Sequence, residues 1–399
     1  MSIPPPRRIG LPPPPRRPHL KVENLGPIKS ADVTFGDLTV FVGPQATGKS
    51  IFLQLLKLLV DTNYVKYEFR RAGIDWEDKF DLFMDVYFGE GMSSLWNKDT
   101  TVQYLEKAIQ LPELVKSTRP TKKESMFFIP AQRVLALREG WPQAFSYYDP
   151  GVPFAVREFS EELRLLMSDF GTSGELFPVP RRLKEEFRDL LQRHIFPGFK
   201  LKVDTQRSQK RLVLSAGETS LPFMVWSAGQ REFVPLLLGL YYLLTSAGAP
   251  RRSGVKWVVI EELEMGLHPR AIGVVILMLF ELVTRGYRVC VSTHSSQVLD
   301  AMWALKHLRE NKASPDALLE VFEAPFTPPM MRLAEQIMKK GTKVFYFDRE
   351  GASTRDISNL DPTAAEAGEA GWGGLSEFSG RANDIVARAV ANSNVERPL

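Results

Sequence analysis

Cysteine occurs only once in the 399 residues, at Cys290, so no disulfide can form within the chain. This excludes folds that depend on disulfides, and a lone thiol is typical of proteins in a reducing cytosol. Long apolar runs are also missing: residues 233–244 and 271–280 fall short of the roughly 20 residues that a membrane-spanning helix needs. The N-terminus is rich in proline rather than in apolar residues, so we see no secretory signal. We therefore expect a cytoplasmic protein without a membrane partner.

Acidic residues are absent from the first 18 positions, which contain four arginines and many prolines. The net charge of +4 therefore belongs to this tail, and the rest of the chain is balanced. A balanced body does not indicate a nucleic-acid face, although it does not exclude one. We interpret residues 1–18 as a disordered Pro/Arg tail, either simply solvated or able to dock on a partner.

Internal repeats and coiled-coil heptads are missing too. Short apolar strands instead alternate with helices, as in a largely parallel sheet covered on both faces. The predicted strands are 20–22, 31–35, 38–42, 126–129, 201–203, 211–214, 257–260, 287–292, 319–322 and 342–347. The predicted helices are 51–60, 159–170, 181–195, 232–244, 271–284 and 381–391, and residues 361–374 are predicted to form a loop.

The stretch GPQATGKS lies between the apolar strand 38–42 and the apolar helix that begins at residue 51. It matches G-x-x-x-x-G-K-[ST], and a strand before it and a helix after it are the context that a P-loop requires. Its glycines let backbone N–H groups curl around phosphate oxygens at the positive end of the helix. Lys49 is expected to reach the β- and γ-phosphates of ATP, and the Ser50 hydroxyl to ligate Mg²⁺. The predicted nucleotide-binding residues are Gly43, Pro44, Gln45, Ala46, Thr47, Gly48, Lys49, Ser50 and Phe52.

Two acids end the apolar strand 257–260, at the carboxyl edge where ligands bind in open α/β sheets. We expect Glu261 to hold Mg²⁺, directly or through water. Glu262 is expected to orient and polarise the attacking water as the catalytic base. Considered alone, the pair is equally well explained as a strand end that meets solvent. A preceding P-loop favours the catalytic interpretation.

Two weaker patterns complete the candidate site. Ser227-Ala228-Gly229-Gln230 precedes an apolar helix, where a hydroxyl and N–H groups can contact an anion. An ordinary helix N-cap is the alternative. His294 follows the strand 287–292, where its ring is placed to hydrogen-bond a γ-phosphate as a second catalytic group, although a lone histidine at a strand end is usually a turn residue.

The order of these features resembles that of the ABC-type ATPases: P-loop, S-x-G-Q, strand with two acids, strand with histidine. The resemblance implies an α/β, ABC-type P-loop NTPase with a mostly parallel sheet, antiparallel N-terminal strands and a helical insertion. It implies that Ser227 and Gly229 belong to a signature that contacts the nucleotide of the opposite protomer. Two chains would then sandwich two ATP molecules head to tail. Gln132 is similar to the Q-loop glutamine, which would add a contact to Mg²⁺.

Several segments resemble the overcoming-lysogenisation-defect branch of these ATPases. They are NLGPI at 24–28, the P-loop with Gln45, IPA at 129–131, EELE at 261–264, LHP at 267–269 and THS at 293–295. Glu261 stands where that branch usually has aspartate, and Leu263 where proline is frequent. The branch includes ATPases of phage-defence systems, among them the ATPase subunits of PARIS systems. The resemblance implies a toxin–antitoxin-like role: an ATPase that senses infection through a trigger such as a phage protein and controls an effector.

A D-x-D pair is absent after residue 300, although the Toprim nuclease of many such relatives needs one to hold metals. The sequence most similar to a D-x-D pair, Asp348-Arg349-Glu350, is interpreted as a loop, so a Toprim effector would be a separate chain. The predicted organisation is a tail at 1–18, an ATPase core at 19–125 and 215–313, a helical insertion or signature subdomain at 126–214, and a C-terminal α/β extension at 314–399.

Two alternatives remain. A DNA-repair ATPase of the SMC or RecF type should bind DNA in an ATP-dependent, salt-sensitive manner. The balanced charge and the missing heptads disfavour it. The ATPase subunit of an ABC transporter is disfavoured by the long segment between P-loop and signature and by the absence of a recognisable membrane-coupling feature.

Overall fold

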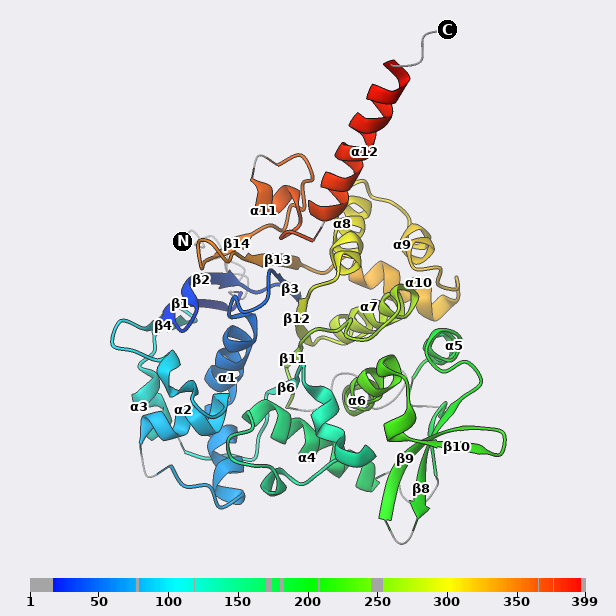
Figure 1. Cartoon of the computed structure of the whole chain (residues 1–399). Helices are drawn as coiled ribbons and strands as arrows, with labels where there is room; N and C mark the ends of the chain where they lie inside the picture. The colour runs from blue at the N-terminus through cyan, green and yellow to red at the C-terminus, as the bar shows by residue number, and fades with distance from the viewer. Residues whose placement is uncertain are drawn as a thin grey trace, which may run out of the picture.

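A computed structural model describes residues 17–76, 79–117, 119–169, 174–179, 183–206, 209–244, 254–364, 366–375 and 377–395. Residues 1–16 of the Pro/Arg tail predicted at 1–18 lie outside these residues. The described chain forms a six-stranded central sheet, two four-stranded antiparallel sheets, and helices that surround them (Figure 1). Within this part, no helix is both long and apolar enough to span a bilayer.

The central sheet has the strand order β14-β13-β3-β12-β11-β6, and all neighbours are parallel except the edge pair β14 and β13. Its bounds are β3 Leu38–Val42, β6 Met126–Ile129, β11 Trp257–Ile260, β12 Arg288–Thr293, β13 Thr342–Phe347 and β14 Thr354–Asp356. The predicted strands 126–129, 257–260 and 342–347 are confirmed. Because β12 lies between the P-loop strand β3 and the acid-bearing strand β11, three functional strand ends meet at one edge.

Alternating side chains of these strands enter two separate cores, as expected for a parallel sheet covered on both faces. Val40 and Val42 join the core beneath α6, α7 and α8, whereas Phe41 joins the core beneath α1. The covering helices lie on opposite sides of the sheet in Figure 1. They are α1 Lys49–Arg71 on one side, and α6 Ala228–Leu243, α7 Pro269–Thr284 and α8 Ser296–Glu310 on the other.

The N-terminal strands form a separate antiparallel sheet, as predicted, with the order β2-β1-β4-β5. This sheet packs on α1 together with two short helices and belongs to the same core as Phe41. Its elements are β1 His19–Leu25, β2 Ile28–Thr34, β4 Thr101–Tyr104, β5 Lys107–Ala108, α2 Phe80–Phe88 and α3 Leu111–Ser117.

A buried ion cluster ties the P-loop helix to the sheet and to the insertion. Lys57, which is fully buried in α1, lies 3.0 Å from Asp61, 3.1 Å from Glu124 and 2.9 Å from Glu158 of α4. Asp61 interrupts the regular helical backbone and also accepts the backbone N–H groups that begin β6. Buried charges must be paired in this way, so the cluster fixes α1 relative to β6 and α4.

The insertion is not purely helical, because it contains the third sheet, with the order β10-β9-β8-β7. Its apolar residues pack against α6 in one continuous core. Its elements are α4 Phe154–Asp169, β7 Glu175–Phe177, α5 Glu185–His194, β8 Lys200–Gln206, β9 Gln209–Ala216 and β10 Thr219–Pro222. The predicted boundaries also shift: β6 pairs with β11 and so belongs to the central sheet, and the inserted sheet extends to Pro222 rather than to 214.

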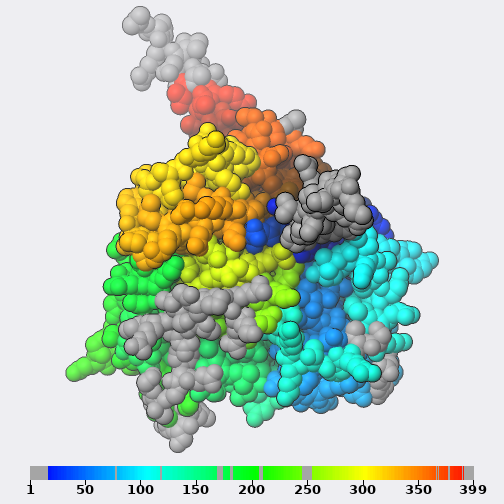
Figure 2. All heavy atoms as spheres, turned by 180° about the vertical axis from the view of Figure 1, so that it is seen from behind, coloured from blue at the N-terminus to red at the C-terminus, as the bar shows by residue number. Residues whose placement is uncertain are grey.

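The C-terminal part, predicted as an α/β extension, adds β13 and β14 to the central sheet, since β13 pairs with β3. One predicted strand, 319–322, is wrong: residues 319–321 lie in the helix α9, which proline begins at its N1 position, and Phe322 follows as its C-cap. The remaining helices are α9 Pro315–Val321, α10 Pro328–Ile337, α11 Ala367–Ala370 and α12 Glu377–Val395. Helix α11 interrupts the loop predicted at 361–374, and α12 confirms the predicted final helix. Seen from behind, α12 projects beyond the body (red in Figure 2).

Candidate nucleotide-binding site

The P-loop turns sharply at two glycines, one packed against the backbone of β13 and the other against the Ile28 side chain. Gly43 has φ 146°, and a Cβ at this position would lie 2.4 Å from the carbonyl oxygen of Phe347 in β13. Gly48 has φ 91°, and a Cβ would lie 2.5 Å from Ile28. Only glycine satisfies both the positive φ and the close approach. These contacts fix the loop between the two neighbouring strands β13 and β2.

Lys49 is folded into this loop. Its Nζ donates to the carbonyl oxygens of Gly43 and Pro44, both at 2.7 Å, and only 7% of the residue is exposed. Burial lowers the pKa of Lys49 to about 8, against the opposing effect of Glu262, Glu264 and Glu261. A desolvated ammonium group held by loop carbonyls is poised for an incoming phosphate, which can replace those weaker acceptors.

Phe52 does not contribute its side chain to this site. The ring is fully buried among Phe35, Phe41 and Phe347, with centroid distances of 6.5, 5.7 and 5.6 Å. Its backbone N–H donates to the carbonyl oxygen of Gly48 as part of the first helical turn. The residue therefore anchors the P-loop helix in the aromatic core, and its predicted nucleotide contact is wrong for the side chain.

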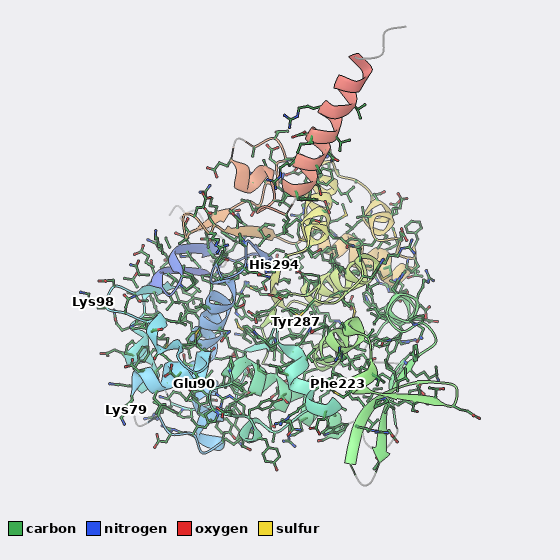
Figure 3. The ribbon with its side chains drawn as sticks, in the orientation of Figure 1. Lys79, Glu90, Lys98, Phe223, Tyr287 and His294 are labelled. Carbon is green, nitrogen blue, oxygen red and sulfur yellow. The ribbon has the colours of Figure 1, made fainter. Side chains whose placement is uncertain are left out.

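A pocket of about 530 Å³ lies in front of the P-loop. It brings together three parts of the predicted site: the P-loop, Glu262 after β11 and His294 after β12. Figure 3 shows His294 near the middle of the molecule, at the end of β12. The lining residues are Pro27, Gln45, Ala46, Thr47, Gly48, Lys49, Ser50, Ile51, Glu262, Ser292 and His294.

Glu261 offers a carboxylate suited to a metal ion. Only 1% of the residue is exposed, and its Oε2 accepts the backbone N–H of Ala131 at 3.2 Å. Its Oε1 is buried without a hydrogen-bond partner among the described residues. Burial raises the pKa of Glu261, and the Ser50 hydroxyl partly offsets this effect. An unsatisfied buried carboxylate oxygen facing a hydroxyl fits the hard oxygen ligands that Mg²⁺ prefers.

Glu262 and His294 face each other at the mouth of the pocket. The distance from Glu262 Oε1 to His294 Nε2 is 3.8 Å, and both side chains remain partly exposed. Glu262 has φ 44°, and its backbone N–H donates to the Ser292 hydroxyl at 3.1 Å. This left-handed backbone turns the two consecutive acids in different directions. Burial, and then the charge of Lys49, lower the pKa of His294, which favours a neutral ring at pH 7.

The signature residues form a regular helix N-cap on an exposed surface. Ser227 Oγ accepts the Gln230 N–H at 3.3 Å, and Gln230 Oε1 accepts the Ser227 N–H at 3.1 Å, so both form a capping box. Ser227 and Ala228 are exposed, and Gly229 is half-buried. None of these four described residues lines the pocket in front of the P-loop. The structure therefore presents the signature outward, separate from the P-loop of the same chain.

A close backbone contact connects the signature to the segment after the two acids. A Cβ on Gly229 would lie 2.6 Å from the carbonyl oxygen of Gly266, which itself has φ 71°. A side chain at 229 would therefore push the signature helix away from this segment. Gln132 is exposed one residue after Ala131, whose N–H binds Glu261. Its predicted metal contact stays a prediction.

Sequence reasoning missed Arg133, which is fully buried between the acid strand and the signature helix. Its guanidinium donates to three backbone carbonyl oxygens: Glu261 at 3.0 Å, Glu262 at 3.1 Å and Glu232 of α6 at 3.0 Å. Burial lowers its pKa, although the group remains charged. Arg133 thus holds the turn that carries both acids against α6. The only sequence signal for this role was the position of an arginine just after β6.

Glu264 is a second group whose role sequence reasoning did not assign. Its carboxylate accepts the Thr293 hydroxyl at 2.9 Å and also accepts the backbone N–H of His294. These bonds fix the turn after β12 from the segment after β11. The orientation of His294 therefore depends on the same segment that contacts Gly229.

One protein-family model matches a part of the chain that includes some of these residues. Residues 150–300 match the family model described as "AAA domain, putative AbiEii toxin, Type IV TA system". The match includes the signature, both acids and His294, but not the P-loop. No curated protein matches the chain.

Solved structures with a similar fold include SMC heads and an ABC transporter cassette. The SMC head bound to the C-winged helix domain of ScpA is 12% identical over 71% of this chain and 90% of its own, with a TM-score of 0.39. The SMC head domain from Thermotoga maritima is 13% identical over 71% of this chain and 91% of its own, with a TM-score of 0.33. The dimeric bacterial ABC transporter cassette MJ0796 is 11% identical over 84% of this chain and 97% of its own, with a TM-score of 0.35.

All three TM-scores lie below 0.5, so the class of the protein depends on the chain's own strand order and motifs. A P-loop follows β3, two acids follow β11, a histidine follows β12, and a capped signature begins α6. These features define a P-loop NTPase fold of the ABC type.

Proposed function

We propose that this chain binds Mg-ATP and hydrolyses it to ADP and phosphate at a site shared between two copies. The carrying observation is that Lys49, Ser50 and Glu262 line one pocket. The buried carboxylate of Glu261, which has an unsatisfied oxygen among the described residues, faces the Ser50 hydroxyl behind it. Lys49 and the P-loop N–H groups would hold the β- and γ-phosphates. Ser50 and Glu261 would ligate Mg²⁺, which when bound neutralises charge on these phosphates.

Glu262 would act as the base that orients the attacking water. The water oxygen forms the new bond to the γ-phosphorus, the bond to the ADP oxygen breaks, and the water proton moves toward the Glu262 carboxylate. The neutral ring of His294, 3.8 Å from Glu262, would hydrogen-bond the γ-phosphate. Arg133 would keep Glu262 in position by holding its backbone carbonyl oxygen.

The second half of the site would come from another copy of the chain. Ser227 is exposed and Gly229 is half-buried at the start of α6, and neither lines the pocket of its own chain, which supports a contact in trans. The positive end of α6 suits the γ-phosphate of the partner's nucleotide. Closure on ATP would be the switch, and hydrolysis would reset it.

The direct test measures ATP binding and hydrolysis by the purified chain. We expect the chain to bind ATP. With Mg²⁺ present, it should hydrolyse ATP and release one phosphate for each ADP formed. Adenosine and AMP, which lack the β- and γ-phosphates, serve as matched negative ligands. Failure to bind any nucleoside triphosphate, with or without Mg²⁺, would contradict the proposal.

We further propose that the ATPase controls a separate effector, of the Toprim nuclease class, in antiviral defence. Support comes from the resemblance of the motifs and from the family description, which names a putative AbiEii toxin of a toxin–antitoxin system. The experiment expresses the chain with its neighbouring genes and measures phage plating. Protection that depends on Lys49 and on a co-purifying nuclease is expected. Salt-sensitive DNA binding by the ATPase alone, without protection, would favour the SMC or RecF alternative.

A further inference from the structure

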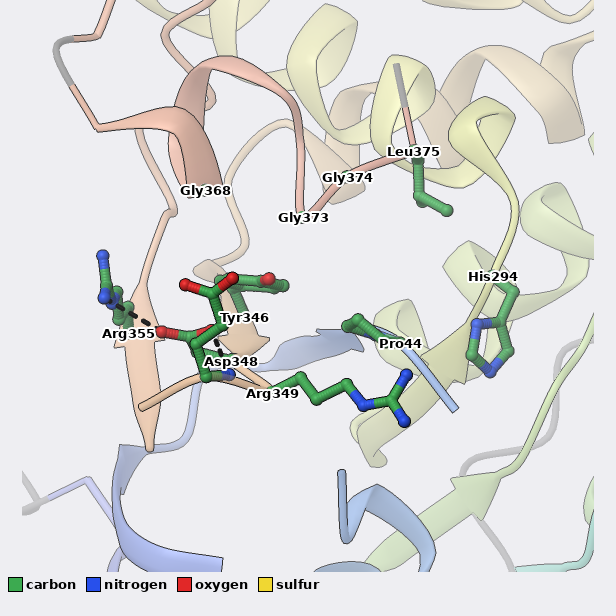
Figure 4. Close-up of a pocket in the computed structure, with 12 residues that line it drawn as sticks. Pro44, His294, Tyr346, Asp348, Arg349, Arg355, Gly368, Gly373, Gly374 and Leu375 are labelled. Atoms are coloured by element: carbon green, nitrogen blue, oxygen red, sulfur yellow. Dashed lines mark hydrogen bonds and ion pairs between the residues drawn. The ribbon is translucent and has the colours of Figure 1, made fainter. Parts of the chain in front are cut away.

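A second pocket, of about 560 Å³, adjoins the nucleotide pocket at the carboxyl end of β13. We call it the β13 pocket. His294 lines both pockets, and the P-loop separates them, because Gly43 and Pro44 line the β13 pocket whereas residues 45–50 line the other. Its remaining lining residues, most of them labelled in Figure 4, are Tyr346, Asp348, Arg349, Glu350, Arg355, Gly368, Gly373, Gly374 and Leu375.

Close packing builds the walls of this pocket. The chain after β13 runs beside the P-loop because the carbonyl oxygen of Phe347 touches Gly43. The opposite wall comes from residues 368–375, which pack on the ring of Tyr346. A Cβ on Gly368 would lie 3.0 Å from that ring, and one on Gly373 would lie 2.9 Å from it. The pocket is therefore a product of the fold rather than an accidental gap between surface loops.

One of the two arginines that line the pocket is already paired. Arg355 lies 3.0 Å from Asp348 and 3.1 Å from Glu366. Arg349 is exposed and makes no hydrogen bond or ion pair with any residue that the structure describes. Figure 4 shows its side chain reaching from the end of β13 past Pro44, in the direction of His294. An unpaired guanidinium thus points toward the side of the pocket that borders the nucleotide pocket.

We propose that the β13 pocket is a phosphate site, where Arg349 binds the inorganic phosphate that leaves the P-loop after hydrolysis. This proposal rests on the proposed ATPase function. The planar fork of an arginine matches two phosphate oxygens, whereas Lys49 stays with the loop and the ADP. The ring of His294 lines both pockets and can hydrogen-bond the anion in either one. The carboxylates of Asp348 and Glu350 also line the pocket and would oppose the anion, so phosphate would bind weakly, as a departing product requires.

The test measures inhibition of ATP hydrolysis by added inorganic phosphate. Arg349→Ala should raise the inhibition constant for phosphate about tenfold, since it removes a charge-assisted contact. The dissociation constant of a non-hydrolysable ATP analogue should stay unchanged. Arg349→Lys, which keeps the charge but not the fork, should fall between. Arg332→Ala, at an exposed arginine on α10, is the matched control and should match the wild type.

Three outcomes would overturn the proposal. Unchanged phosphate inhibition in Arg349→Ala is one, and an equal loss of affinity for the ATP analogue is another, because Arg349 would then contact the nucleotide itself. If the wild type does not hydrolyse ATP, the proposed function fails, and phosphate binding is instead measured by titration of the Mg-ADP complex. Phosphate binding that depends on Arg349 would then still support the site. Phosphate binding that does not depend on Arg349 is the third outcome that would overturn the proposal.

Discussion

The two halves of the candidate site differ in how complete they are. On the P-loop half, Lys49 is buried against loop carbonyls, Glu261 has an unsatisfied oxygen, and a pocket already exists. On the signature half, Ser227 is exposed and its hydroxyl is satisfied by its own helix cap. The P-loop half is thus preorganised for a ligand, whereas the signature half does not line the nucleotide pocket of its own chain.

This difference indicates what each half contributes. A preorganised polar site lowers the cost of binding charge, so the P-loop half should determine nucleotide affinity. The signature half should determine assembly and turnover, because under the proposed function its N-terminal N–H groups would meet phosphate only when another chain supplies it. Arg133 spans both halves, since it binds the carbonyl oxygens of both acids and of Glu232 in the signature helix.

The largest expected effect separates binding from chemistry in the P-loop half. Glu262→Gln should lower kcat about 10³-fold, because the amide cannot accept the proton of the attacking water. ATP affinity should change little, so ATP remains trapped and the closed assembly accumulates. Single-turnover cleavage and equilibrium binding measure the two quantities. Wild-type turnover in this variant would remove Glu262 from the mechanism.

Lys49→Ala tests whether the P-loop half alone sets affinity. Loss of a buried ammonium that binds two phosphates should weaken ATP binding about 10²-fold. Lys98→Ala, at an exposed lysine remote from the site in Figure 3, is the control and should bind normally. Titration calorimetry gives both constants. Unchanged ATP binding in Lys49→Ala would refute the site assignment.

Arg133→Met tests the connection between the halves. Three carbonyl oxygens lose their donor, so the free energy of unfolding should fall by about 2 kcal/mol. Because the turn that carries Glu262 is no longer held, kcat should fall at least about tenfold while KM for ATP changes less. Arg138→Met, at an exposed arginine nearby, is the control. A stability loss without a change in kcat would assign Arg133 a structural role only.

The smallest effect is a pH dependence of nucleotide binding. With a pKa of about 8, Lys49 is neutral in much of the nucleotide-free protein above that pH, but must be charged to bind phosphate. Affinity should therefore fall about tenfold between pH 7 and 9, with proton uptake on binding. Lys49→Arg, which does not titrate, should lose this dependence. Calorimetry in buffers of different ionisation enthalpy measures the uptake.

The same pKa predicts the sign for stability without nucleotide. The unfolded chain binds the proton of Lys49 up to its ordinary value of 10.5, whereas the folded chain releases it near 8. Between these values the unfolded state holds more protons, so the contribution of this group to the free energy of unfolding rises with pH. An opposite trend in the difference between wild type and Lys49→Arg would contradict the assigned environment.

Much of the framework was predictable from the sequence, because the core strands are apolar runs with clear ends. Two of these runs, 126–129 and 257–260, are entirely apolar, and 342–347 is largely so, which favours buried strands. Pro130 ends the first run, and the two acids end the second. The stretch 319–322 was ambiguous: a short apolar run fits either strand or helix, and Pro315 is the helix signal that decides it.

Within the site, motifs gave the ends of strands but not the contacts between them. Side chains that act on the backbone of distant segments, such as Arg133 and Glu264, have no local pattern. The fully buried ring of Phe52 shows the opposite error, since nearness to the P-loop in sequence did not mean nearness to the nucleotide pocket. The β13 pocket could not be predicted, because strand pairing alone brings residue 349 beside residue 44.

Mixing two inactive variants tests the central claim most directly: that each site combines Lys49 of one chain with Ser227 of another. Lys49→Ala keeps a working signature, and Ser227→Arg keeps a working P-loop, while neither alone should cleave ATP. The account predicts that the mixture regains roughly a quarter of the wild-type single-turnover ATP cleavage, because half the dimers are mixed and each holds one intact site. No recovery, although mixed dimers form, or full activity of Ser227→Arg alone, would contradict it.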